Sequence, residues 1–150
     1  MKVVIQRVKN ASVDIEGERV GQIQQGMLIF LGIHEEDTSK EIDYLVRKIC
    51  GLRIFEDENE KMNYSISQID GEILLISQFT LYADTKKGNR PGFDKAAKPD
   101  IAIPLYEEFK EKLSKNNIKL QTGQFGANMQ IKLINDGPVT IIIDTLEVNI

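Results

Sequence analysis

The sequence has few of the side chains that perform hydrolytic or redox chemistry. It contains one cysteine, Cys50, one histidine, His34, and no tryptophan among its 150 residues. One cysteine cannot form an internal disulfide, so nothing indicates an oxidising compartment. A Ser-His-Asp or Cys-His site needs a histidine beside its nucleophile, and only His34 is available. We expect His34 to be an exposed loop residue and Cys50 to be a buried structural thiol.

Several sequence motifs are also missing. There is no GxxxxGK[ST] phosphate loop, no GxGxxG dinucleotide fingerprint and no set of histidines and cysteines for a zinc site. No apolar run approaches the roughly 20 residues that cross a bilayer. Residues 1–7 lack the apolar segment of a signal peptide. We therefore expect a cytoplasmic protein with no membrane partner.

The charge is low and unevenly distributed. The formal net charge is −4 and the pI is about 5.1, which weighs against a protein that coats DNA or long RNA through phosphate neutralisation. Contact with the end of an RNA remains open. One segment, residues 86–98, is basic and contains a single acid, Asp94. Its cations are Lys86, Lys87, Arg90, Lys95 and Lys98. This segment is either a solvated loop or a local phosphate contact.

The pattern of apolar residues predicts many strands and two helices. Alternation of β-forming residues or short apolar runs predicts strands over residues 2–8, 11–16, 19–24, 27–31, 52–55, 72–79, 117–122, 128–134 and 139–145. The run Met27–Leu31 has no polar residue and predicts a strand that is buried on both faces.

Two helices are predicted. Thr38-Ser39-Lys40-Glu41 is a capping box, and the apolar residues of 42–49 that follow share one helical face until Gly51 ends the helix. The second helix is predicted over residues 102–115. Its start is expected near residue 103, because proline fits only the first helical turn and Pro104 would occupy it.

These elements predict one domain, residues 1–150, of the α+β class. A chain of this length can bury a sizeable core without disulfides. The predicted hairpins favour a mixed or antiparallel sheet, or a partly closed barrel, with the two helices packed on one side. The longest irregular stretch is residues 83–99, and long loops in compact domains are often functional.

The segment Ser77-Gln78-Phe79-Thr80 lies where a buried strand ends. Backbone N–H groups at such an exit are free of the strand ladder, and a pair of them can form an oxyanion hole. One such donor is worth roughly 2.7–4 kcal/mol of transition-state stabilisation. The alternative is a strand end whose hydroxyl groups cap their own backbone. The hydroxyls of Ser77 and Thr80 are weak nucleophiles without a base.

The segment Asp136-Gly137-Pro138 has the composition of a turn. An X-Pro bond is the one kind of peptide bond in which the cis form costs only about 0.5–1 kcal/mol. The alternative is an ordinary trans hairpin turn between two strands.

Together, the two motifs resemble the signature motifs of the D-aminoacyl-tRNA deacylases, also called the D-tyrosyl-tRNA deacylase family. The resemblance extends along the whole chain, in family order and spacing. The matching segments are Gln6-Arg7-Val8, Ala11-Ser12-Val13, Leu52-Arg53-Ile54-Phe55, Ser77-Gln78-Phe79-Thr80-Leu81, Gly88-Asn89-Arg90-Pro91, Gly123-Gln124-Phe125-Gly126-Ala127-Asn128-Met129 and Asn135-Asp136-Gly137-Pro138-Val139-Thr140.

The resemblance implies a cytoplasmic homodimeric hydrolase. Such enzymes cleave the ester between a D-amino acid and the 3′-terminal ribose of tRNA, and they also remove mischarged glycine. Gly137-Pro138 is implied to be cis and to enter the active site of the other subunit. There its carbonyls would face the substrate's α-amino group and leave no room for an L side chain.

The resemblance also implies roles for individual residues. Backbone groups of Phe79 and Thr80 would hold the ester carbonyl, beside Ser77. The pocket would be lined by Gln78, Phe125 and Met129. The resemblance leaves two roles for the Thr80 hydroxyl, attack on the ester or positioning of the substrate. The absence of a base near it favours positioning, with the ribose 2′-OH assisting water. Lys86, Lys87 and Arg90 are candidate contacts to the acceptor end of tRNA. No metal or organic cofactor is implied.

Two other functions fit the same residues. A small strand-rich domain with few catalytic side chains could bind an RNA end or a nucleotide without chemistry. A dimeric scaffold whose two motifs are only turns is the third possibility, and it would have no affinity for tRNA.

Overall fold

The longest strands of the fold, β1 and β8, organise one mixed sheet. The computed structural model describes residues 1–150. The sheet strands are β1 (Lys2–Ile15), β2 (Glu18–Ile23), β3 (Gly26–Gly32), β6 (Glu72–Ser77), β7 (Lys119–Thr122) and β8 (Gln130–Asp144). A small hairpin of β4 (Phe55–Glu56) and β5 (Met62–Tyr64) lies apart. The helices are α1 (Ser39–Gly51) and α2 (Pro99–Ser114), with 3-10 turns η1 (Ser67–Ile69), η2 (Phe79–Tyr82) and η3 (Thr145–Glu147).

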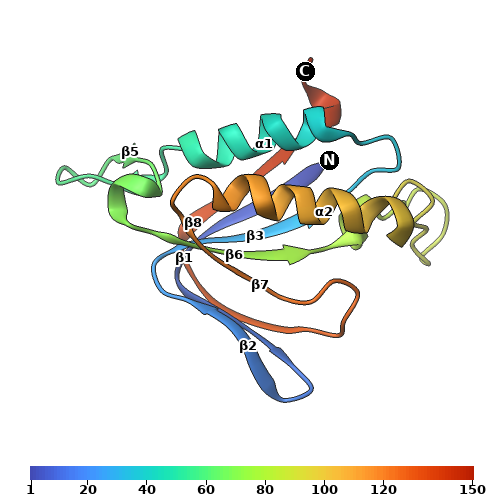
Figure 1. Cartoon of the computed structure of the whole chain (residues 1–150), viewed down its shortest axis with the longest axis horizontal. Coiled ribbons are helices and arrows are strands. Elements are labelled where there is room, and N and C mark those ends of the chain that lie inside the picture. Colours follow the sequence, from blue (N-terminus) through green and yellow to red (C-terminus); the bar gives the residue numbers. More distant parts are fainter.

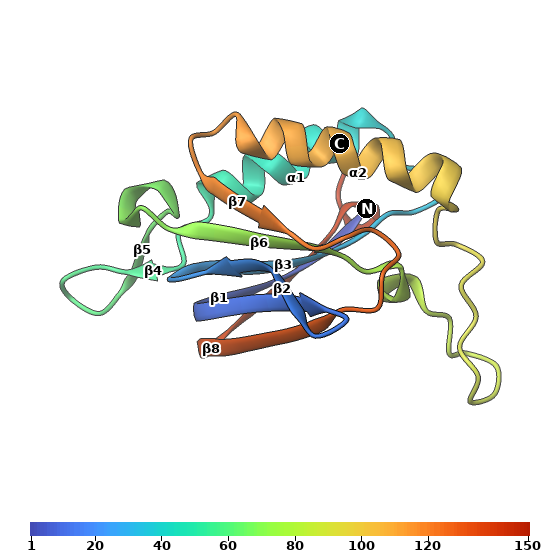
Figure 2. The same ribbon diagram turned by 60° about the horizontal axis from the view of Figure 1, so that its bottom comes forward.

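β1 bends and exchanges neighbours along its length. Its first half pairs with β3 and with the end of β8, whereas its second half pairs with β2 and with the start of β8. These pairs are antiparallel, but β3–β6 and β6–β7 are parallel. The sheet therefore folds over on itself like a partly closed barrel, while both helices cover one face (Figures 1 and 2). The predicted α+β class, with a mixed sheet and helices on one side, is confirmed.

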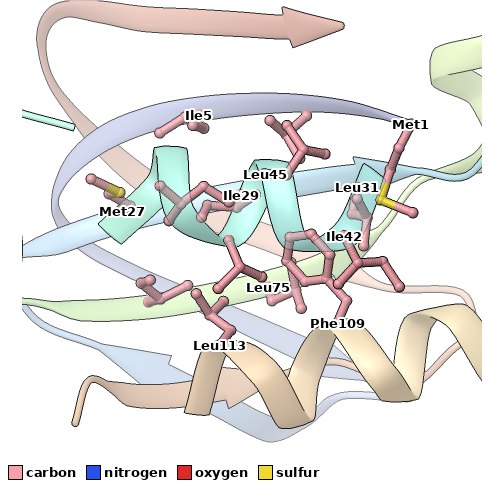
Figure 3. Packing of buried hydrophobic residues seen from close by; sticks show 14 of the residues in the cluster. Met1, Ile5, Met27, Ile29, Leu31, Ile42, Leu45, Leu75, Phe109 and Leu113 are labelled. Carbon is pink, nitrogen blue, oxygen red and sulfur yellow. The ribbon is translucent and has the colours of Figure 1, made fainter. Parts of the chain in front are cut away.

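The core has two parts, one on each face of the sheet. Under the helices, Ile5, Ile29 and Leu75 of the sheet pack with Phe109 and Leu113 of α2 (Figure 3). A smaller cluster, which includes Val13 and Leu28, fills the fold of the bent sheet. Because β3 contributes to both parts, its side chains are buried on both faces, as the uninterrupted apolar run predicted.

α1 begins and ends as predicted, whereas α2 does not. The Thr38 hydroxyl accepts a hydrogen bond from the Lys40 N–H at 3.3 Å, and Glu41 Oε2 accepts from the Thr38 N–H at 2.7 Å. α2 starts at Pro99, earlier than the predicted start near 103, and Pro104 lies inside it. The proline in the first helical turn is Pro99, not Pro104 as predicted. Pro104 has no N–H group, so it leaves one helical carbonyl without a hydrogen-bond donor. Neither helix is long and apolar enough to span a membrane.

Several strand boundaries differ from prediction, and the strand β5 was not predicted. The ranges 2–8 and 11–16 form the single strand β1, and 128–134 and 139–145 form the single strand β8. Both strands continue through register irregularities because each remains paired with the other on both sides of the interruption. The predicted strand 52–55 is reduced to Phe55–Glu56, because Leu52 caps α1 instead.

His34 is buried, which corrects the predicted exposed loop position. Its exposed fraction is 6%, and its ring meets Tyr82 edge-on at 5.2 Å between centroids. The burial arises because the loop before α2 returns to the residues that follow β3, where the Ala97 N–H donates to the Ile33 carbonyl at 2.9 Å. Because this contact joins residues that are far apart in sequence, local composition does not predict it. Cys50 is half-buried, and burial raises the pKa of its thiol.

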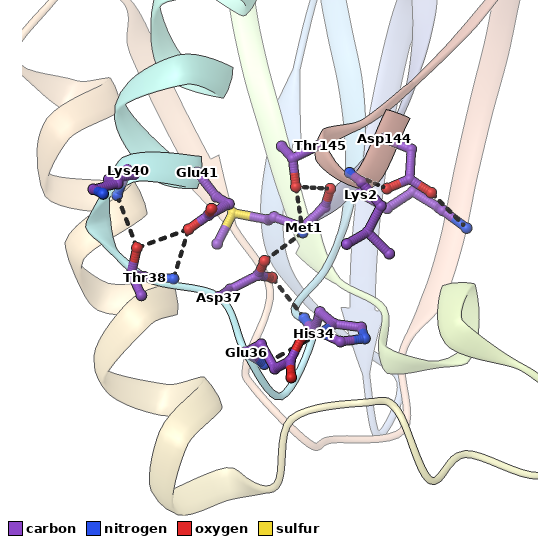
Figure 4. Close-up of polar contacts among 11 residues, drawn as sticks. Met1, Lys2, His34, Glu36, Asp37, Thr38, Lys40, Glu41, Asp144 and Thr145 are labelled. Atoms are coloured by element: carbon purple, nitrogen blue, oxygen red, sulfur yellow. Dashed lines mark hydrogen bonds and ion pairs between the residues drawn. The ribbon is translucent and has the colours of Figure 1, made fainter. Parts of the chain in front are cut away.

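The start of β1 and the end of β8 meet in a polar cluster around Met1 (Figure 4). The Met1 α-ammonium is fully buried and lies 2.6 Å from Asp37 Oδ1 and 2.7 Å from Thr145 Oγ1. Asp37 Oδ2 also accepts a hydrogen bond from the His34 N–H at 2.6 Å. This cluster joins β1, the loop before α1 and the turn that follows β8.

Candidate active site

A cleft of about 290 Å³ opens where β6 ends. It is mostly apolar, and its lining includes Ser77, Gln78, Phe79, Phe125 and Met129. The chain reaches the cleft from two directions: from β6 into η2, and along the loop between β7 and β8. These five residues were all singled out from the sequence, and the fold brings them to one place. Their chemical roles stay predictions.

The turn η2 begins beside the cleft: Phe79 lines the cleft, whereas the predicted site residue Thr80 does not. The Gln78 N–H makes the last contact to β3, donating to the Leu31 carbonyl at 2.7 Å. Phe79 and Thr80 are the first two residues of η2, so their N–H groups have no acceptor within that turn. The turn is closed behind them by the Leu81 N–H, which donates to the Gln78 carbonyl at 3.2 Å. Two adjacent donors at a strand exit are the arrangement that an oxyanion site needs.

The Thr80 hydroxyl has no base beside it. The side chain that it contacts is the Gln78 amide, whose Nε2 donates to Thr80 Oγ1. His34 does not line the cleft, and its Nδ1 accepts a hydrogen bond from the Glu36 N–H at 3.2 Å. No three His, Cys, Asp or Glu side chains lie close enough together to hold a metal ion. The structure therefore shows no side chain that would activate this hydroxyl as a nucleophile.

The Gly137-Pro138 segment lies within β8 and does not line the cleft of its own chain. The peptide bond between the two residues is cis, and both residues are exposed. The segment is therefore no hairpin turn between two strands, because β8 pairs with β1 on both sides of it.

Arg7 and Asn135 hold this segment in place. Arg7 is 4% exposed, and its guanidinium donates to the Asp136 carbonyl at 2.9 Å and to the Ile54 carbonyl at 2.6 Å. Asn135 Nδ2 donates to the carbonyls of Arg7 and Val139, at 3.0 Å each.

Sequence reasoning assigned no role to either of these residues. The available signal was the position of Arg7: it follows Val3 and Ile5 on the buried side of an alternating strand, where a cation needs a specific partner.

The basic loop residues do not reach the cleft. Lys86, Lys87 and Arg90 are all exposed, in the segment that follows η2, and none lines the cleft. The same loop supports η2 from outside, because Phe93 packs edge-on against Phe79 at 5.0 Å between ring centroids.

The sequence matches the model of one protein family over residues 4–144, the family described as D-Tyr-tRNA(Tyr) deacylase. The chain belongs to this family. It is 53% identical over 148 residues to a D-aminoacyl-tRNA deacylase of Thermosipho africanus, covering 99% of both chains. It is 55% identical over 146 residues to one of Flavobacterium johnsoniae, covering 97% of both.

Two solved structures have the deacylase fold seen here. A protein named c-Myc DNA Unwinding Element Binding Protein superposes with a TM-score of 0.90 at 44% identity, covering 96% of this chain and 98% of that one. A probable eukaryotic D-amino acid tRNA deacylase superposes with a TM-score of 0.81 over 95% of this chain and 97% of that one. At 16% identity, the second likeness concerns the fold alone.

Proposed function

We propose that this protein hydrolyses the ester bond that joins a D-amino acid to the 3′-terminal ribose of tRNA. The observation that carries the proposal is the apolar cleft next to the two free N–H groups of η2, in a chain more than half identical to proteins named D-aminoacyl-tRNA deacylases. The protein would release the free amino acid and intact tRNA in the cytoplasm. Mischarged glycyl-tRNA, which lacks a side chain of either hand, is a second substrate of the same site.

In this proposal the backbone performs most of the catalysis. The N–H groups of Phe79 and Thr80 bind the ester carbonyl and stabilise the oxyanion that forms when water attacks. Donors fixed in advance are effective because they need no reorganisation during the reaction. The substrate's own 2′-OH assists the water, since no histidine of the chain lies at the cleft. Gln78 holds the Thr80 hydroxyl so that it orients the ester.

Discrimination between D and L substrates is assigned to Gly137-Pro138 of a second subunit. The segment is exposed, is held by Arg7 and Asn135, and lies outside the cleft of its own chain. Its carbonyls would bind the α-amino group and leave no space for an L side chain. A homodimer is further supported by large apolar side chains that are more than half exposed, among them Phe79, Ile134 and Ile142.

A DNA-binding function is the second candidate, because one similar structure is that of a protein named for binding a DNA unwinding element. Binding along duplex DNA requires lysines and arginines that neutralise several phosphates. This chain has a net charge of −4, and its one strongly basic segment is the loop of residues 86–98. These features favour contact with a single RNA end.

The test is deacylation of D-Tyr-tRNA and L-Tyr-tRNA by the purified protein in the presence of EDTA. We expect rapid loss of the D ester while the L ester persists. Loss of both esters would retain the hydrolase and reject the chiral filter. Loss of neither ester, with binding of a non-hydrolysable analogue retained, would indicate a binding module instead.

Thr80→Ala is expected to retain measurable deacylation. The variant keeps the backbone donors and removes only a hydroxyl that no base activates, so we expect a loss of about tenfold, the size of one hydrogen bond of roughly 1.4 kcal/mol. Single-turnover rates on D-Tyr-tRNA measure the effect, with circular dichroism as the folding control. Complete loss of turnover in a folded variant would make Thr80 the nucleophile.

A further inference from the structure

A second cleft, of about 260 Å³, lies on the other side of η2 from the strand exit. It is formed by the start of β1, the end of η2 with the loop that follows, and the end of β8. Its lining contains three lysines, two aspartates and one buried aromatic residue: Lys2, Lys86, Lys95, Asp84, Asp144 and Tyr82. None of these residues lines the candidate active site.

Both carboxylates of this cleft are already occupied. Asp144 Oδ2 lies 3.3 Å from Lys2 Nζ, and Asp144 Oδ1 accepts from the Leu146 N–H at 3.0 Å. Asp84 Oδ1 accepts from the backbone N–H of Lys86 at 2.9 Å. The ammonium groups of Lys86 and Lys95 form no ion pair within the chain, and with Lys2 the three lysines exceed the two aspartates by one positive charge. In a protein of net charge −4, this local excess of positive charge favours an anion.

The buried wall of the cleft carries an unpaired donor. Tyr82 is 8% exposed, its ring lies 5.1 Å from Lys2 Nζ, and its hydroxyl has no hydrogen-bond partner. Buried polar groups without partners are rare, and each one needs an explanation. Burial raises the pKa of Tyr82, and the nearby carboxylates of Asp37 and Asp144 raise it further. The phenol therefore stays neutral, and this wall of the cleft adds no negative charge that would repel an anion.

We propose that this cleft binds a phosphate of the tRNA acceptor strand while the terminal ester occupies the active site. The inference rests on the proposed function and names a further contact for the same substrate. η2 borders both clefts, with Phe79 at one and Tyr82 at the other. A 3-10 turn rises about 2.0 Å per residue, so the backbone of Phe79 and that of Tyr82 lie about 6 Å apart along the turn. Because one short turn borders both clefts, adjoining groups of one nucleic-acid chain can reach the two.

A contact of this kind affects binding and leaves the chemical step unchanged. It is made equally in the ground state and in the transition state, so its loss raises KM and leaves kcat in place. It also contributes to the salt dependence, because each phosphate contact on a single strand adds about 0.7 to the slope of log affinity against log salt. A substrate without the phosphate would be insensitive to the cleft.

The experiment compares the double variant Lys86→Gln/Lys95→Gln with wild type on two substrates, D-Tyr-tRNA and 3′-O-D-tyrosyl-adenosine. The control is Lys61→Gln/Lys115→Gln, which removes the same charge from exposed lysines that line neither cleft. For the cleft variant we expect about a tenfold or larger rise in KM for the tRNA, a shallower salt slope and an unchanged kcat. Its rate on the adenosine ester should equal that of wild type, and the control should match wild type on both substrates.

The outcomes separate this inference from the proposed function. Failure of wild type to cleave either substrate would reject the deacylase itself. Wild-type activity with an unchanged KM in the cleft variant, or an equal KM rise in the control, would reject the phosphate site. Competition by inorganic phosphate identifies the ligand source: if the cleft variant loses phosphate inhibition but keeps its KM for tRNA, the cleft binds free phosphate and the inference is wrong.

Discussion

Gly137→Ala is expected to lower kcat/KM for D-aminoacyl-tRNA by about 100-fold while the protein remains folded. A Cβ atom added at Gly137 would lie 2.5 Å from Asn135 Oδ1. Asn135 cannot move aside freely, because its Nδ2 donates to the carbonyls of Arg7 and Val139. The added methyl group therefore displaces either the amide or the exposed Gly137-Pro138 segment. A displacement of about 1 Å in a group that positions substrate can cost about 10²-fold in rate.

The stability loss of this variant is expected to be much smaller than its loss of activity. Breaking the two Asn135 hydrogen bonds costs about 1–3 kcal/mol, which lowers Tm by several degrees in a chain of this length. Gly51→Ala is the matched control, since a Cβ at Gly51 meets nothing within 4 Å. In a double-mutant cycle, Asn135→Ala/Gly137→Ala should be no less active than Asn135→Ala alone, because the obstacle is gone. Additive losses would contradict the steric explanation.

The same variant tests whether the motif acts across subunits. Gly137→Ala leaves the cleft of its own chain untouched, whereas Ala127→Trp is designed to fill that cleft and leaves the motif intact. If the protein forms the proposed homodimer, mixed dimers of the two impaired proteins contain one cleft and one motif that are both undamaged. We expect co-refolding of the two variants to restore deacylation. If mixing restores nothing although mixed dimers form, the motif serves its own chain.

Short sequence patterns correctly predicted the elements that are determined by residues close together in the sequence. The capping box at Thr38 and the apolar face that follows it contain all the information needed to start and orient α1. The run Met27–Leu31 likewise reports its own burial on both faces. The ends of β1 and β8 were less predictable, because continuous pairing between two distant strands carries each through its irregular residues. The strand propensity of a short segment does not reveal the distant strand with which it pairs.

The candidate site likewise has parts that the sequence predicted and parts that it did not. The motif at Ser77-Gln78-Phe79-Thr80 was identifiable because a buried strand stops there, and its first three residues line the cleft. The supports of Gly137-Pro138 were not identifiable, since Arg7 is more than a hundred positions away and reaches Asp136 only through the pairing of β1 with β8. The burial of His34 has the same origin: it depends on a loop that returns to the residues that follow β3.

Asp37→Ala is expected to give the largest loss of stability among single substitutions outside the apolar core, about 3–5 kcal/mol. The Met1 α-ammonium is fully buried, and the Asp37 side chain, 2.6 Å away, is 4% exposed. Removing the carboxylate leaves a buried cation that has lost its ion-pair partner, with the Thr145 hydroxyl as its remaining hydrogen-bond acceptor and Glu41 as a more distant negative charge. It also removes the acceptor of the His34 N–H. Because this cluster joins the start of β1 to the end of β8, the loss should appear as cooperative destabilisation of the whole domain.

Asp43→Ala is the control, because it breaks an ion pair of the same length with different burial. Asp43 Oδ1 lies 2.6 Å from Lys112 Nζ, but the Asp43 side chain is 63% exposed. An exposed pair of this kind contributes about 0.2–1 kcal/mol, since water solvates both charges when the pair is broken. Urea unfolding at neutral pH measures both variants. Equal losses would mean that burial of the Met1 ammonium adds nothing to the energy of its ion pair. A loss several times larger for Asp37→Ala would identify desolvation of that cation as the reason the fold depends on one carboxylate.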